Sequence, residues 1–392
     1  MMLSLPPLAL YIHVPWCVRK CPYCDFNSHT LLEDLPETTY IDALLADLDA
    51  ELVDVQGRVL TSIFIGGGTP SLVSGAGYQR LLTGIRERMT LAPDIEITLE
   101  ANPGTFERER FADFRRAGIN RLSVGVQSFD NDALARLGRI HDADEAVRAI
   151  STAREVGFDE LNIDLMHGLP GQNMSSALAD IDQALALSPS HLSWYQLTLE
   201  PNTAFYSRPP TLPEEDVLAD IQDAGQTRLE AAGFQRYEIS AWSRPGHEAR
   251  HNLNYWRFGD YLGIGAGAHG KVSRPGEHGL VIERRWKTRQ PETYLTRHGD
   301  PRGFVAGHRV LSRDERGLEF LMNALRLSDG VPRALWQQHT GLDDARLDAH
   351  TRAAIASELM LETHSRIQAT PLGLLFLNDL LALCDDSVLA RS

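Results

Sequence analysis

Three cysteines near the start of the chain offer the most specific chemistry in the sequence. Cys17, Cys21 and Cys24 form a C-x3-C-x2-C pattern directly after an apolar run, LALYIHV. A cubane iron–sulfur cluster bound by three thiolates keeps one iron open for another ligand, whereas an electron carrier normally closes all four irons. Zinc and inert thiols are the alternatives, although structural zinc usually takes a fourth Cys or His. The spacing predicts an iron–sulfur cluster with one open iron.

The sequence around these cysteines alternates strand-like and helical segments. Six apolar or β-branched runs end in polar or glycine residues: LALYIHV, TSIFIGGG, DIEITLEANP, RLSVGVQSF, ELNIDLMHGLP and HLSWYQLTLEP. Between the first two runs, leucines at 44, 45, 48 and 52 follow Ile41 at helical spacing, as on a helix that packs against a sheet. Strand-then-helix units joined by short loops imply parallel strands with right-handed crossovers. The predicted fold class is therefore α/β, a partial (βα)6 barrel.

Polar and glycine residues gather where these runs end. The residues are His13, Gly66 to Thr69, Glu100, Gln127, Asp164 and Thr198. Each of them could be a simple turn residue. Because the carboxyl ends of parallel strands form the ligand-binding face of βα folds, we expect them to converge on one site beside the cysteines.

The rest of the chain has a different pattern. A proline-rich loop at 201–213 follows the last strand-like run, and residues 251–290 are rich in glycine, histidine and aromatic residues. Helical patterns then dominate to the end of the chain. The predicted units are a barrel at 1–240, a connecting region at 241–305 and a smaller, mainly helical C-terminal domain at 306–392.

Composition indicates a folded protein without a strongly cationic surface. Of its 392 residues, 43% are hydrophobic and 23% charged, which excludes a disordered or disulfide-scaffold chain. The net charge of −15 gives no global positive field, so no nucleic-acid partner is expected. No apolar run reaches the about 18 residues that cross a bilayer. A secretory signal is also not expected, so the chain is predicted to stay in a reducing cytoplasm, where clustered cysteines more often hold metal than form disulfides. The isolated Cys384 is predicted to be a buried core thiol.

The run YIHVPWCVRKCPYCDFNSH, followed by the strand-end GGGTP, resembles the radical S-adenosylmethionine superfamily. Within that superfamily, the sequence is similar to the branch that contains oxygen-independent coproporphyrinogen oxidase and the HemW-type heme chaperones. The resemblance implies a [4Fe-4S] cluster on the three cysteines, whose open iron chelates the amino and carboxylate groups of S-adenosylmethionine. The cofactor then supplies the radical chemistry, and the protein positions and shields it.

The resemblance also implies which residues surround S-adenosylmethionine. Tyr11 precedes the cysteine loop and Tyr23 lies inside it, where the family places aromatic residues next to the cofactor. The glycine motif of the family and its ribose and methionyl contacts correspond to Gly67, Gly68, Thr69, Glu100, Gln127, Arg139 and Asp164. Glycines permit close backbone approach, and the polar side chains can bond hydroxyl, ammonium and carboxylate groups. Taken alone, three glycines are more often a plain turn and an isolated arginine a surface charge.

A second motif, HNLNYW at 251–256, resembles the H-N-x-x-Y-W motif of the heme chaperones. Its chemistry suits heme, because the His251 imidazole can ligate iron while Tyr255 and Trp256 offer flat faces to a porphyrin. Asn252 can fix a propionate or orient the imidazole. The alternative is a core turn with two buried aromatic residues and a hydrogen-bonded histidine. Three other histidines are interpreted as structural because nothing in their spacing distinguishes them: His29, His167 and His269.

Two departures from the oxidase pattern favour a chaperone. The oxidase branch carries an additional cysteine two positions after the third cluster cysteine, where this chain has Phe26, and it has a longer segment before the motif. We therefore predict a heme chaperone that binds heme and delivers it to respiratory acceptor proteins, with peripheral membrane contact through those acceptors. The alternative is an oxygen-independent coproporphyrinogen III oxidase, so enzymatic activity stays open. A radical enzyme acting on RNA is disfavoured by the negative charge.

Overall fold

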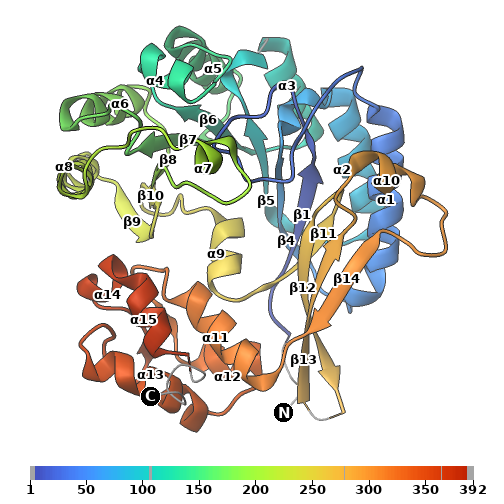
Figure 1. Ribbon diagram of the computed structural model, residues 1–392. Helices are drawn as coiled ribbons and strands as arrows, with labels where there is room; N and C mark the ends of the chain where they lie inside the picture. The colour runs from blue at the N-terminus through green and yellow to red at the C-terminus, as the bar shows by residue number, and fades with distance from the viewer. Residues whose placement is uncertain (1–4, 106–107, 278, 363, 386–392) are drawn as a thin grey trace.

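The computed structural model describes residues 5–105, 108–277, 279–362 and 364–385. Its amino-terminal half is a curved sheet of six parallel strands with connecting helices, which confirms the predicted partial (βα)6 barrel (Figure 1). The strands, in their order in the sheet, are β1 (Leu8–Val14), β4 (Leu60–Gly67), β5 (Leu91–Ala101), β6 (Arg121–Gln127), β7 (Glu160–His167) and β8 (His191–Gln196). Each lies on one of the six apolar runs, as expected of parallel strands covered on both faces.

Helices cover the outer face of this sheet. They are α1 (Glu37–Glu51), α2 (Gly75–Arg88), α3 (Arg108–Ala117), α5 (Ala143–Glu155), α6 (Met174–Ala186) and α8 (Glu215–Ala231). The short helices α4 (Asn131–Arg136) and α7 (Ala204–Ser207) instead pack near the cysteine loop. Ile41, Leu44 and Leu48 of α1 are buried in the main core, which confirms the helix predicted there. Polar caps fix where several helices begin; α5 starts with a capping box between Asp142 and Glu145.

The same sheet continues beyond both ends of the barrel. Within the described residues it has twelve strands, because β10 (Ala241–Ser243) and β9 (Gln235–Glu238) follow β8 while β11 (Asp260–Ile264) pairs parallel with β1. Three antiparallel strands then extend it: β12 (His269–Gly276), β13 (Gly279–Lys287) and β14 (Val305–Val310). Our sequence analysis predicted no strands between 251 and 310. One reason is Gly263 in β11, where a Cβ atom would lie 2.0 Å from the His269 carbonyl oxygen. The close approach of β11 and β12 therefore requires glycine, a residue of low strand propensity, and this weakens the strand pattern in the sequence.

Buried charges fasten α1 to the added strands. The Lys287 ammonium of β13 lies 2.5 Å from a carboxylate oxygen of Asp47 and 2.5 Å from one of Glu51. The guanidinium of the adjacent Arg285 pairs with Glu51 and Asp54. Moving β13 away from α1 would leave these buried charges uncompensated, which is costly. The cluster therefore holds β13 against the barrel.

The C-terminal region is mainly helical, as predicted. It contains α11 (Arg313–Ala324), α12 (Ala334–Thr340), α13 (Asp344–Ala356), α14 (Pro371–Leu375), α15 (Leu377–Leu383) and the short paired strands β15 (Val331–Pro332) and β16 (Arg366–Ile367). Phe320 and Trp336 lie in its core, into which Ile282 of the large sheet also packs. Cys384 is fully buried there, which confirms the predicted core thiol. The boundaries at 240 and 305 stay predictions. Across the described residues, no helix combines the length and apolar character needed to span a membrane.

Candidate functional site

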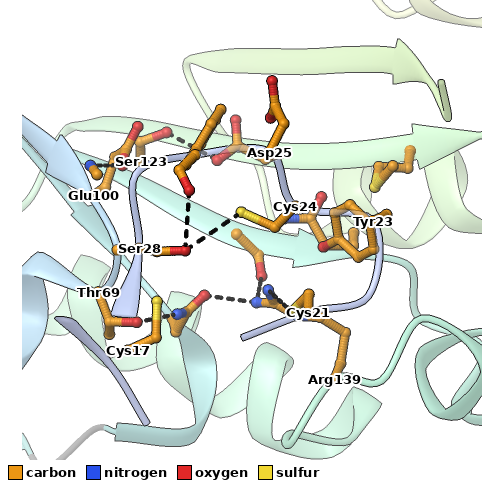
Figure 2. Close-up of a pocket in the computed structure, with 18 of the residues that line it drawn as sticks. Cys17, Cys21, Tyr23, Cys24, Asp25, Ser28, Thr69, Glu100, Ser123 and Arg139 are labelled. Carbon is orange, nitrogen blue, oxygen red and sulfur yellow. Dashed lines mark hydrogen bonds between the residues drawn. The ribbon is translucent and has the colours of Figure 1, made fainter. Parts of the chain in front are cut away.

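A cavity of about 640 Å³ lies at the carboxyl ends of the parallel strands, beside the cysteine loop (Figure 2). We call it the main cavity. The predicted residues that line it are Cys17, Cys21, Tyr23, Cys24, Gly67, Gly68, Thr69, Glu100, Gln127, Arg139, Asp164, Asn252 and Trp256. Tyr11, His251 and Tyr255 do not line it. The structure therefore brings most of the predicted site residues together, including two from the HNLNYW motif.

The cysteine loop is held at both of its ends. β2 (Trp16–Cys17) and β3 (His29–Thr30) pair in parallel across its base. Lys20 donates a hydrogen bond to the Phe26 carbonyl at 3.1 Å, and Ser28 lies with its hydroxyl 3.9 Å from the Cys24 sulfur. Figure 2 shows the thiols of Cys17 and Cys24 directed toward the space beside Ser28. These contacts fix the conformation of the loop.

The thiol arrangement fits a polynuclear cluster. The three thiols come from one short loop and line the same cavity. Three thiolates around one space are the protein ligands of a cubane cluster with one open iron. Burial raises the pKa of Cys17 and of Cys24, so the thiolates need the positive charge of a bound centre. The residues therefore fit a [4Fe-4S] cluster.

The glycines after β4 let the cysteine loop approach the strand. Gly67 has φ +119°, and a Cβ atom there would lie 2.7 Å from the His13 ring. A Cβ atom on Gly68 would lie 2.5 Å from the Trp16 carbonyl oxygen, which belongs to the backbone and cannot swing away. Asn102 donates a hydrogen bond to the Thr69 hydroxyl at 3.0 Å, which orients that side chain at the cavity wall. The glycines are thus required by close packing as well as by turn geometry.

Two carboxyl groups, Glu100 and Asp164, give the cavity an electrostatic preference for cations. Burial and the proximity of Asp164 raise the pKa of Glu100 to about 8. The carboxyl also accepts a 3.1 Å hydrogen bond from the Gly67 amide. Burial raises the pKa of Asp164 as well. A ligand that brings an ammonium or sulfonium group would favour the ionised form of both.

Gln127 and Arg139 also line the main cavity. Gln127 is a non-glycine residue with φ +71°, an uncommon conformation at the end of β6, and its amide oxygen accepts a 2.9 Å hydrogen bond from the Tyr195 hydroxyl. Arg139 donates to the Gly125 carbonyl at 2.6 Å, and another guanidinium nitrogen lies 3.7 Å from the Cys21 sulfur. The side chain is half-buried. Arg139 is therefore part of the cavity wall, and the surface-charge alternative does not describe it.

The HNLNYW motif forms most of a short helix, α9 (Arg250–Trp256). His251 is only 1% exposed, and its ring stacks on Phe64 and meets the Tyr255 ring edge-on, with centroids 5.2 and 4.7 Å away. Its Nδ1 bonds to the Ser62 hydroxyl at 3.0 Å, and burial lowers its pKa to about 3. Its Nε2 is buried and has no hydrogen-bond partner among the described residues. In this conformation no ligand reaches the imidazole.

Tyr255 instead faces a second, adjoining cavity of about 400 Å³, which we call the annex cavity. Its wall includes Tyr11, Phe26, Tyr255, Tyr261, His269 and Arg289. Glu100 and Gly67 line both cavities, so the two spaces adjoin. Helix α9 thus contributes Asn252 and Trp256 to one cavity and Tyr255 to the other.

A buried chain of hydrogen bonds, which sequence analysis missed, runs from Asp164 toward α9. The Asn162 amide donates to Asp164 at 2.7 Å, and its oxygen accepts from His191 Nδ1 at 2.6 Å. The Tyr237 hydroxyl lies 2.8 Å from His191 Nε2 and also interacts with the side chain of Asn252. Polar residues inside otherwise apolar strands, such as Asn162, were the only signal in the sequence.

Comparison with known proteins agrees with this geometry. The model of the Radical SAM superfamily matches residues 11–184, and that of the HemN C-terminal domain matches residues 311–376. Heme chaperone HemW from Escherichia coli is 52% identical over 387 residues, which span 97% of this chain and 99% of that protein. Heme chaperone HemW from Haemophilus influenzae is 50% identical, over 97% of this chain and 98% of that protein.

A solved structure shares the complete architecture. Coproporphyrinogen III oxidase (HemN) from Escherichia coli, described as a radical SAM enzyme, superposes with a TM-score of 0.81 over 97% of this chain and 90% of that one. At 24% sequence identity this match concerns the fold. The sequence relatives, in contrast, match at high identity from end to end. The chain therefore belongs to the radical SAM superfamily and, within it, to the family of the heme chaperone HemW.

Proposed function

We propose that this protein is a heme chaperone that binds heme and transfers it to respiratory acceptor proteins in the cytoplasm or at the membrane surface. The observation that carries the proposal is the position of α9, whose HNLNYW motif contributes side chains to both the main cavity and the annex cavity. Similarity to proteins named heme chaperone over nearly the whole chain supports it. His251, Asn252, Tyr255 and Trp256 are the proposed heme-binding motif.

In this proposal the main cavity holds a [4Fe-4S] cluster on Cys17, Cys21 and Cys24, with S-adenosylmethionine beside it. When bound, the two together supply one-electron chemistry. The chain itself provides the cation-attracting carboxylates Glu100 and Asp164, on strands β5 and β7, which flank β6.

Polar contacts to the rest of S-adenosylmethionine are proposed for Thr69, Gln127 and Arg139, which line the same cavity. Gly67 and Gly68 would bring the backbone close to the ligand. Tyr23 lines the main cavity within the loop, whereas Tyr11 lies in the annex cavity, its hydroxyl hydrogen-bonded to His13 at 2.8 Å. Tyr11 would therefore act from the annex cavity, on the far side of Glu100, which lines both cavities.

Phe26 separates this proposal from an oxidase function. Its ring is 54% exposed and lines both cavities, at the position where the oxidase branch carries a further cysteine. A phenyl ring cannot bind metal or carry a proton, but it can cover the face of a flat apolar ligand. The oxidase is nevertheless the alternative to be tested, because the fold is shared with one.

The test is anoxic reconstitution with iron, sulfide and S-adenosylmethionine, followed by two parallel assays. In the first, ferric heme is titrated and its transfer to a heme-depleted cytochrome b complex is followed by absorbance. In the second, coproporphyrinogen III is added. We expect stoichiometric heme binding and transfer without porphyrinogen turnover. Formation of protoporphyrinogen IX together with 5′-deoxyadenosine would overturn the chaperone proposal, and so would failure to bind heme.

A further inference from the structure

The long connection between β8 and α8 passes beside the cysteine loop. Residues 197–214 separate the two elements, and the short helix α7 lies within them (Figure 1). We call residues 198–208 the α7 arm. Connections of more than about 12–15 residues are uncommon in compact domains, and ordered ones commonly carry function. The contacts of the arm with the cysteine loop are therefore a candidate for such a function.

A backbone hydrogen bond joins the arm to the part of the loop between Cys21 and Cys24. The Phe205 amide donates to the Pro22 carbonyl at 3.0 Å. This carbonyl lies inside a turn that is closed by a 3.2 Å hydrogen bond from the Cys24 amide to the Cys21 carbonyl. The turn carries two of the three proposed cluster ligands. The arm is thus bonded directly to the segment that sets the spacing of those two thiols.

The Phe205 side chain packs against the same turn. Its ring centroid lies 6.3 Å from that of Tyr23, and the two ring planes meet at 48°. Both rings pack against a small apolar cluster that is separate from the main core and includes Leu137 and Leu197. Such satellite clusters are typical beneath long loops. Phe205 therefore connects the turn to an apolar cluster of the barrel through its ring as well as its backbone.

The residues after α4 confine the turn as well. Gly138 has φ +69°, and a Cβ atom there would lie 2.8 Å from the Pro22 side chain. A guanidinium nitrogen of Arg139 lies 3.7 Å from the Cys21 sulfur. The Pro22 ring therefore contacts the chain after α4, while the Pro22 carbonyl accepts the hydrogen bond from Phe205. Two separate elements thus hold the turn.

Thr203 fixes the conformation of the arm itself. It is 5% exposed and caps the amino terminus of α7, where its hydroxyl accepts a hydrogen bond from the Tyr206 amide at 3.1 Å. The same hydroxyl donates to the Glu200 carbonyl at 2.7 Å. A side-chain cap of this kind stabilises the first turn of a helix. Because Phe205 is the second residue of α7, the cap sets the direction of its amide.

We propose that the α7 arm is a clamp on the Cys21–Cys24 turn, with Phe205 as its main positioning residue, and that this clamp limits the loss of iron from the protein. The inference rests on the proposed cluster ligands. Neither Phe205 nor Thr203 lines the main cavity, so both act through the turn. Iron escapes when a thiolate moves away from it, and a thiolate on a fixed turn stays in place to bind again. Packing that locks the supporting residues of a metal site has this effect.

The test compares Phe205→Ala with Tyr206→Ala, the next residue of α7. The Tyr206 side chain is 56% exposed and forms no hydrogen bond with a described residue. Each full-length variant is reconstituted anoxically, and iron release to a ferrous chelator is followed by absorbance. Loss of a half-buried phenyl ring should open the turn roughly tenfold more often, so Phe205→Ala should release iron roughly tenfold faster. Tyr206→Ala should match the wild type, and Phe205→Leu, which keeps apolar bulk, should restore most of the wild-type rate.

Hydrogen–deuterium exchange of the metal-free full chain tests the clamp without the cluster. The amides of Cys24 and Phe205 both donate backbone hydrogen bonds, so they exchange when the clamp opens. Peptides covering residues 17–28 and 198–208 should exchange roughly tenfold faster in Phe205→Ala, while the distant strand β13 keeps its wild-type rate. Thr203→Val keeps the shape of the side chain but removes the cap, and it should accelerate exchange in the same peptides roughly fivefold.

The outcomes separate the clamp from the proposed cluster. If the wild type takes up no iron, the cluster proposal fails and the exchange measurement alone decides on the clamp. If the wild type holds iron and Phe205→Ala has wild-type rates of iron release and exchange, the cluster stands and the clamp is overturned. Equal acceleration in Phe205→Ala and Tyr206→Ala would also overturn it, because the specific contacts of Phe205 would then not matter. If Phe205→Ala does not fold, Thr203→Val takes its place, and wild-type rates in that variant overturn the clamp.

Discussion

Replacing Glu100 by glutamine is expected to remove much of the pH dependence of S-adenosylmethionine binding. The carboxyl is buried, and desolvation together with the neighbouring Asp164 raises its pKa to about 8. It is therefore only about one-tenth ionised at pH 7 and about one-hundredth ionised at pH 6. A cationic ligand binds the ionised form, so protons compete with the ligand over this range.

The magnitude follows from that titration. Wild-type affinity should gain roughly tenfold between pH 6 and 7 from this carboxyl and level off above pH 8, and binding at pH 7 should release about 0.9 proton from it. The direction of this pH dependence follows from the raised pKa of Glu100. The ligand-free protein holds a proton on this carboxyl and releases it when the cation binds, so the affinity rises with pH. Above pH 8, where the wild type is ionised, Glu100→Gln should bind roughly 10- to 100-fold more weakly, the range for a lost hydrogen bond to a charged group.

Anoxic isothermal titration calorimetry in two buffers of different ionisation enthalpy measures both the affinity and the proton release. The α-amino group of S-adenosylmethionine itself titrates at roughly 7.7–8.0, so the difference between wild type and Glu100→Gln carries the test. Glu87→Gln, at an exposed position of α2, is the matched control. Equal slopes and equal proton release in wild type and Glu100→Gln would refute the assignment of Glu100 to the cation site.

Three further predictions concern the cluster, the glycine edge and the buried ion cluster. Cys21→Ser should lower the iron content of the reconstituted protein, whereas Cys384→Ser, which changes a core thiol, should leave it intact; equal iron in both variants would exclude Cys21 as a ligand. Gly68→Ala places a Cβ atom 2.5 Å from the Trp16 carbonyl oxygen, so it should displace the cysteine loop and cost about 1–3 kcal/mol in urea unfolding. An unchanged unfolding midpoint would show that the loop adapts freely. Lys287→Met leaves two buried α1 carboxylates without their ammonium and should cost about 3–5 kcal/mol, measured by the same unfolding experiment; a neutral or stabilising effect would mean that the carboxylates take up protons or water.

The parallel barrel could be predicted from the sequence because its determinants are local. Each strand is a short apolar run that ends in glycine or polar residues, and α1 shows its buried stripe in the spacing of Ile41, Leu44 and Leu48. β11 could not be predicted in this way. Its partner is β1, with Leu8 opposite Asp260, and no local pattern predicts a pairing between segments so far apart in the sequence.

The candidate site shows the same difference between local features, which the sequence reveals, and long-range contacts, which it does not. Cysteine spacing and strand ends indicated the main cavity, because they are short-range features. The burial of His251 behind Phe64 and Tyr255 could not be read from the motif, since it depends on β4 lying beneath α9. The exposure of His269 likewise depends on how β12 leaves the large sheet. Residues whose surroundings depend on long-range pairing are therefore the ones whose burial sequence analysis could not predict.

The interior position of β1 has a consequence for how the protein is made. β1 lies between β4 and β11, so its second edge stays unpaired during synthesis until residues 260–264 have left the ribosome. Unpaired apolar edges of nascent chains promote aggregation, so the emerging half-barrel is a natural client of holding factors. The cysteine loop also gains its anchors late, since Asn27 bonds to the carbonyls of Ala266 and Arg289. Metal loading should therefore follow translation. A chain ending at residue 240 would lack β11, so one edge of β1 would stay unpaired.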